Sequence, residues 1–139
     1  MSRLPRHLEH LKTGFTAEAV AAARLRAYAG RAERDGLPNL ARHWLALAEA
    51  KDALALAQLE AAGQVRGAEV DLGAAVAEES YENEVLYPKM IGEADEETAR
   101  VFQEVVKAQR EHLERLERLR ADYQASRGDV PGPPASPPC

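Results

Sequence analysis

The chain of 139 residues has very little cysteine and few aromatic residues. Its single cysteine, Cys139, stands at the end of a proline-rich stretch, and aromatic residues make up 5% of the sequence. One cysteine cannot form an intrachain disulfide, and without a C-x-x-C pair the sequence offers no zinc ribbon. Alanine and leucine are abundant instead, which favours helices that pack closely through small side chains.

Long apolar runs and strongly basic stretches are also missing. No apolar run approaches the roughly 18 residues of a membrane-spanning helix, and no secretory core follows the charged residues at the N-terminus. The formal net charge is −5 and the isoelectric point is near 5.4. No basic surface combined with aromatic residues is indicated, so nucleic acid is not an expected partner. These absences predict a soluble cytoplasmic protein with no membrane partner. No serine–histidine–aspartate order or phosphate-binding loop indicates nucleophilic or phosphoryl-transfer chemistry.

Four segments carry apolar residues at steps of three and four, which predicts four amphipathic helices. Thr16, Asp71 and Asp95 are candidate N-caps, and Gly36 is a candidate stop. Pro88 predicts a kink or an early end of the third helix. The predicted helices run from Thr16 to about Asp35, from Pro38 to about Ala62, from Asp71 to a break near Leu86, and from Asp95 to about Gln124.

The predicted organisation is an N-terminal arm at residues 1–14, a helical domain at residues 15–125 and a disordered proline-rich tail at residues 126–139. The expected fold is an all-α, ferritin-like four-helix bundle built from two helical hairpins. The linker at residues 63–71 reaches about 30 Å when fully extended, whereas the second helix is about 37 Å long. An up-down-up-down monomer and a homodimer that exchanges hairpins both satisfy this limit.

Polar residues interrupt each apolar stripe near its centre. Isolated charges in a buried seam cost several kcal/mol unless they are paired or bind a metal. Dimetal carboxylate bundles use a glutamate from each of two helices and a Glu-x-x-His from each of the other two. The interrupting residues are Glu18 in the first stripe, Lys51 in the second, Glu79 and Glu82 in the third, and Gln109 and His112 in the fourth.

On these residues the chain resembles the rubrerythrin family over roughly residues 15–120. The motifs that carry the resemblance are Glu-Glu-Ser-Tyr-Glu at 78–82, Glu-x-x-Tyr-Pro at 84–88 and Ala-Gln-Arg-Glu-His at 108–112. The resemblance implies a ferritin-like fold with a diiron centre that reduces hydrogen peroxide. Such a protein would be a peroxide-linked oxidoreductase.

The resemblance also implies roles for individual residues. Glu18 and Glu79 match terminal ligands, Glu82 matches a ligand that adjusts the coordination of one iron, and His112 matches the histidine of the fourth helix. The chain departs from the family at three places. Lys51 and Gln109 stand where bridging glutamates are expected, and Leu54 stands where a histidine is expected. The four cysteines of a rubredoxin domain are missing too, so redox activity would need an external electron donor.

A full diiron centre is not expected without its bridging carboxylates. Three other interpretations remain. Glu79, Glu82 and His112 could hold one iron, manganese or zinc ion, with Gln109 as a weak oxygen ligand. Alternatively, the site holds no metal, Lys51 neutralises the remaining carboxylates, and the bundle is a non-catalytic structural or interaction module. In the third interpretation Lys51 is a buried amine that takes part in a covalent or oxidative reaction.

Overall fold

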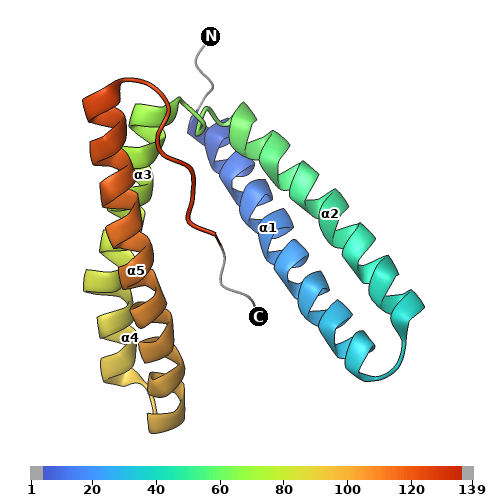
Figure 1. Cartoon of the computed structure of the whole chain (residues 1–139). Helices are drawn as coiled ribbons and strands as arrows, with labels where there is room; N and C mark the ends of the chain where they lie inside the picture. The colour runs from blue at the N-terminus through green and yellow to red at the C-terminus, as the bar shows by residue number, and fades with distance from the viewer. Residues whose placement is uncertain (1–4, 136–139) are drawn as a thin grey trace. The chain divides into compact units, whose positions relative to one another are not determined.

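The computed structural model describes residues 5–135, and this part of the chain is helical and without strands (Figure 1). The all-α prediction is therefore confirmed. The chain divides into two compact units, Met1–Val65 and Arg66–Cys139. Each unit is a helical hairpin. Cys139 lies outside the described residues.

The first hairpin pairs α1 (Pro5–Arg34) with the antiparallel α2 (Pro38–Ala61) (Figure 1). A Schellman turn joins them, because the amide of Leu37 donates to the carbonyl of Ala32 at 2.8 Å and that of Gly36 to Glu33 at 3.1 Å. Gly36 has φ +75°, a conformation that glycine adopts at little cost. The predicted stop at Gly36 and start at Pro38 are confirmed.

The start of α1 differs from the prediction. The helix begins at Pro5 and not at Thr16, so the expected N-terminal arm is helical from Pro5 onward. Leu8, Leu11 and Phe15 are partly buried and continue the three- and four-residue spacing, which carries the helix through Gly14. A side chain at Gly14 would collide with the amide of Gln58, so the end of this α2 side chain lies against α1.

Alanine forms the contact between α1 and α2. Trp44 packs beside this alanine seam and meets the ring of Tyr28 edge to face, with ring centroids 5.5 Å apart. The alanines of α2 recur every seven residues and so stay on one face of the helix. Small side chains allow helix axes to approach to about 8 Å, the short end of the usual range. The seam consists of Ala22, Ala29 and Ala32 on α1 and Ala41, Ala48 and Ala55 on α2.

The larger apolar residues of α2 lie beside this seam and remain exposed. Leu40, Leu47 and Leu54, the leucine stripe, are 42%, 50% and 51% exposed. Steps of three and four residues put this stripe on one face of the helix, and the contact between α1 and α2 alone does not bury its leucines. The reason is that the adjacent alanine repeat brings the two backbones together and leaves the longer side chains outside the contact.

The second hairpin consists of α3 (Ala68–Tyr81), the π-helix η1 (Glu82–Leu86), α4 (Tyr87–Glu93) and the long returning α5 (Glu96–Ser126) (Figure 1). The kink predicted near Leu86 takes the form of the π-turn, and the helix continues beyond it to Glu93. A π-turn contains one additional residue per turn, and such turns are frequent at functional sites. Here the amide of Tyr87 donates to the carbonyl of Glu82.

The two predicted caps of this hairpin have different outcomes. Asp95 caps α5 as predicted, since its carboxylate accepts the amide of Thr98 at 2.8 Å. This hydrogen bond lowers the pKa of Asp95. The cap therefore stabilises the folded protein fully when the pH is above the usual carboxyl pKa, and this stabilisation is lost as the pH falls through the lowered value. Asp71 is not an N-cap. It lies inside the first turn of α3 and accepts the amides of Arg66 and Gly67 at 3.0 and 3.1 Å.

Beyond α5, residues 127–135 have no regular structure and run back beside the helix (Figure 1). Residues 130–134 line a shallow hollow with Arg115 and Leu119 of α5. Disorder of the tail stays a prediction.

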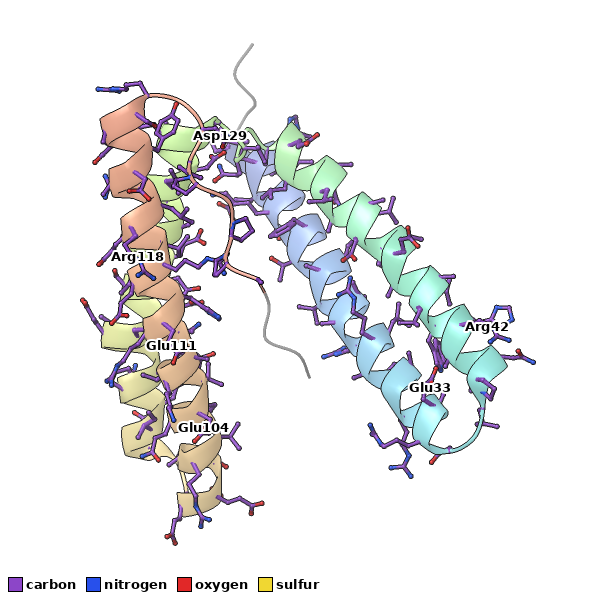
Figure 2. The ribbon with its side chains drawn as sticks, in the orientation of Figure 1. Glu33, Arg42, Glu104, Glu111, Arg118 and Asp129 are labelled. Atoms are coloured by element: carbon purple, nitrogen blue, oxygen red, sulfur yellow. The ribbon has the colours of Figure 1, made fainter. Side chains whose placement is uncertain are left out.

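Glu104, Glu111 and Arg118, labelled in Figure 2, are seven residues apart and follow the exposed side of α5. Within residues 5–135 no helix is long and apolar enough to cross a membrane.

The alanine seam predicts that Ala48→Leu destabilises the protein. Ala48 is 1% exposed, and the larger side chain does not fit the contact without strain. The free energy of unfolding should therefore fall by about 1–3 kcal/mol. Ala46→Leu, on the exposed side of the same helix, is the matched control and should be nearly neutral. Urea unfolding followed by circular dichroism measures both. Equal losses in the two variants would contradict the seam.

Candidate functional site

The first half of the predicted site lies between α1 and α2. Glu18 projects from α1 and Lys51 from α2, and the lysine Nζ is 3.0 Å from Oε2 of the carboxylate. Their side chains are 23% and 39% exposed, so the pair is partly shielded from water. Oε2 of Glu18 is buried and accepts no hydrogen bond of good geometry, which makes the contact an ion pair held by charge.

Glu18 matches the rubrerythrin pattern, and Lys51 departs from it. Lys51 stands where a bridging carboxylate is expected, and it places a cation against Glu18. Leu54, one turn further along α2, is 51% exposed and has no atom that could bind a metal. Of these three positions, the first hairpin therefore offers one carboxylate, and that carboxylate already has a positive partner.

The second half of the predicted site lies between η1 and α5. Gln109 on α5 donates from Nε2 to Oε2 of Glu82 at 3.1 Å, and this hydrogen bond is partly buried. Glu82 is the first residue of the π-turn, so the irregular turn begins at the carboxylate itself. The amide at position 109 thus contacts a residue that the resemblance assigns to metal coordination.

Two further polar atoms of this hairpin have no partner. Oε2 of Glu79 and Oε1 of Gln109 are buried and make no hydrogen bond. A buried polar atom left without a partner costs about 1–3 kcal/mol, and more when it is charged. His112 is exposed and does not complete a ligand set. In the part of the chain that the structure describes, no three histidine, cysteine, aspartate or glutamate residues gather so that they could hold a metal.

Sequence reasoning missed Asn83, the residue after Glu82. Asn83 is 8% exposed, and neither Oδ1 nor Nδ2 has a hydrogen-bond partner. Asn83 is four residues after Glu79 and three before Leu86, and helical spacing puts these positions on the same side of the helix. That spacing was the signal in the sequence that could have found it.

No protein-family model and no curated protein matches the chain. The resemblance to rubrerythrins rests on the motifs at residues 78–82, 84–88 and 108–112. The two polar contacts of the site add the observation that Lys51 and Gln109, the departing residues, each touch a glutamate that the resemblance treats as a ligand.

The ion pair predicts a measurable coupling between Glu18 and Lys51. In a double-mutant cycle with Glu18→Gln and Lys51→Met, the coupling in unfolding free energy should be about 1 kcal/mol or more, because the pair is partly buried. Lys51→Met alone should destabilise more than the double variant does, since it leaves the carboxylate without its cation.

The matched control is the pair Arg31–Asp35, whose side chains are 73% and 45% exposed. An exposed pair one turn apart on a helix contributes about 0.3–0.5 kcal/mol. If the coupling between Glu18 and Lys51 is no larger than that of the control pair, partial burial does not strengthen the ion pair.

Proposed function

We propose that this protein is a non-catalytic helical module, related in pattern to the rubrerythrins, in which the chain's own side chains take the place of metal. The observation that carries the proposal is the ion pair of Lys51 with Glu18 at 3.0 Å. An ammonium group in contact with a ligand-type carboxylate supplies the positive charge that a metal ion would supply, and it repels a second cation. The bundle then serves as a structural or interaction module.

The contact between Gln109 and Glu82 supports the same proposal. A glutamate at position 109 would face the carboxylate of Glu82, and two carboxylates that close require a cation between them or a proton on one of them. The amide removes that requirement because Nε2 donates a hydrogen bond to Glu82. Both departures from the metal-binding pattern therefore replace repulsion between carboxylates with attraction.

We propose further that the first and second hairpins join in a ferritin-like four-helix bundle. The support is the leucine stripe of α2, since a hairpin held by alanine alone leaves these side chains 42–51% exposed. Covering a leucine contributes about 1.5–3 kcal/mol. A second hairpin that packs on this face buries all three.

The linker bears on how the bundle forms. Residues 62–67 join the two hairpins and reach at most about 21 Å, whereas α2, with 24 residues, is about 36 Å long. The linker is thus too short to return along the helix. We propose a homodimer in which hairpins are exchanged between two copies, with the simple monomeric bundle as the alternative that solution size decides.

A second candidate function is binding of a single iron, manganese or zinc ion, with peroxide-linked redox chemistry and an external electron donor. The observation in its favour is the buried, unpartnered Oε2 of Glu79. A metal ion there would satisfy the charge, with Glu82 and His112 as further ligands. It would have to displace the hydrogen bond from Gln109 and draw in the exposed His112.

Metal content distinguishes these functions. Protein purified without chelators should contain well below one metal ion per chain, measured by elemental analysis. The triple variant Lys51→Glu, Leu54→His and Gln109→Glu restores the family's ligand types and should bind about two irons per chain. The matched control, Lys89→Glu, Leu56→His and Gln124→Glu, makes the same exchanges at exposed positions and should bind none.

Near-stoichiometric metal in the unmodified protein would reject the metal-free module in favour of the second candidate. A folded triple variant that takes up no iron would show that the residues do not align with the family's ligands.

The leucine stripe predicts a variant that cannot assemble. Light scattering during size-exclusion chromatography should give a dimer for the unmodified chain. Leu47→Glu with Leu54→Glu places charge in the proposed contact, so the dimer should dissociate with a loss of about 3 kcal/mol or more. Leu45→Glu with Leu56→Glu, at positions that are 48% and 57% exposed, is the matched control and should stay dimeric. A monomeric unmodified chain would contradict hairpin exchange.

A further inference from the structure

We propose that the second hairpin has a binding site for a small organic anion, a carboxylate with a short apolar body. The site is a pocket of about 370 Å³ between the η1–α4 segment and α5. Its polar lining comes from Asn83, Gln103, Lys107 and Arg110, and its apolar lining from Pro88, Ile91 and Val106. Pockets for small molecules begin at about 300 Å³ and combine apolar walls with a few convergent polar groups.

The charge of the lining selects an anion. Lys107 and Arg110 are three residues apart on α5, so their side chains start from the same side of the helix about 5–6 Å apart. No carboxylate lines the pocket. Neither cation has an ion-pair partner among the residues that the structure describes.

Asn83 supplies the directed hydrogen bond. It is 8% exposed, it lines the pocket, and both polar atoms of its amide lack partners. A buried amide without a partner costs about 1–3 kcal/mol. Neighbouring atoms cover Nδ2, so binding requires the Asn83 amide to turn toward the carboxylate. The hydrogen bond that Nδ2 then donates offsets part of that cost. The cations hold its charge from the side of α5, and Asn83 fixes its orientation from the side of η1.

The apolar lining indicates that the ligand is more than an inorganic ion. Val106 is 7% exposed and shares the buried part of the pocket with Asn83, while Pro88 and Ile91 line it from α4. These groups offer nothing to phosphate or chloride, whereas they gain from covering an alkyl chain or a ring. A carboxylate with a body of a few carbon atoms matches both parts of the lining.

The pocket is independent of the proposed function. At 3.6 residues per turn, Gln103, Lys107 and Arg110 lie on a different side of α5 from Gln109 and His112. A ligand in the pocket therefore does not use the residues of the predicted metal site. Failure of the anion site would leave the metal-free module intact, and the reverse also holds.

The test uses the full chain labelled with ¹⁵N and titrated with hexanoate, with hexylamine and inorganic phosphate as comparison probes. Hexanoate should shift the side-chain amide signals of Asn83 and the backbone signals of residues 103–110 in a saturable manner. Lys107→Gln with Arg110→Gln should weaken hexanoate binding at least about tenfold, the effect of 1.4 kcal/mol. Arg100→Gln with Arg118→Gln, on α5 outside the pocket, changes the net charge equally and should weaken it less than about twofold.

Three results would overturn the proposal. One is the absence of saturable shifts at Asn83 with hexanoate. Another is an equal response to phosphate or to hexylamine, which would remove the need for an apolar body or for negative charge. The third is equal weakening in the pocket variant and in its charge-matched control, which would mean that the anion responds only to the overall charge of the helix.

Discussion

The close approach of α1 and α2 through alanine is the constraint on which the first hairpin depends. Because Ala22 and Ala29 face the repeat Ala41, Ala48 and Ala55, the two backbones come together and the antiparallel register is fixed. That register sets Gly14 against Gln58 and Glu18 against Lys51. The register also determines which apolar side chains the hairpin leaves exposed. The leucine stripe lies beside the seam, so the geometry that forms the ion pair also leaves these leucines half exposed.

The polar contacts of both hairpins follow one electrostatic rule. A carboxylate that leaves water needs a compensating cation or hydrogen-bond donor. Glu18 has the ammonium of Lys51, and Glu82 has the amide of Gln109. Glu79 has no such partner for Oε2. Two of the three carboxylates therefore have a compensating partner within the chain, and Glu79 has a buried oxygen without one. This difference separates the two candidate functions and locates their disagreement at Glu79.

The sequence predicted the regular parts of this fold well, because helix ends are local. Gly36, Pro38 and Asp95 mark ends that need only neighbouring residues to explain them, and the structure has them there. The sequence was less informative where two patterns competed. The leucine stripe and the alanine repeat both have helical periodicity, and periodicity alone does not tell which of two adjacent faces brings backbones into contact. The pairing of Glu18 with Lys51 was predictable from charge and position. The exposure of His112 was not, since it depends on what packs against α5.

The π-turn was the least predictable element, and it has the largest consequences for the second hairpin. Pro88 cannot donate to a carbonyl one turn earlier, and the helix absorbs this loss over residues 82–86 without ending. Glu82 and Asn83 are the first two residues of this turn, and consecutive residues of a helix point in different directions. Glu82 reaches Gln109 on one side of α5, while Asn83 lines the pocket beside Lys107 and Arg110 on another. The buried amide of Asn83 has no hydrogen-bond partner, which costs about 1–3 kcal/mol. A turn that places a ligand-type carboxylate and a buried free amide in succession is better explained as a junction between two separate polar sites. One is satisfied by the chain itself, and the other is open to a ligand.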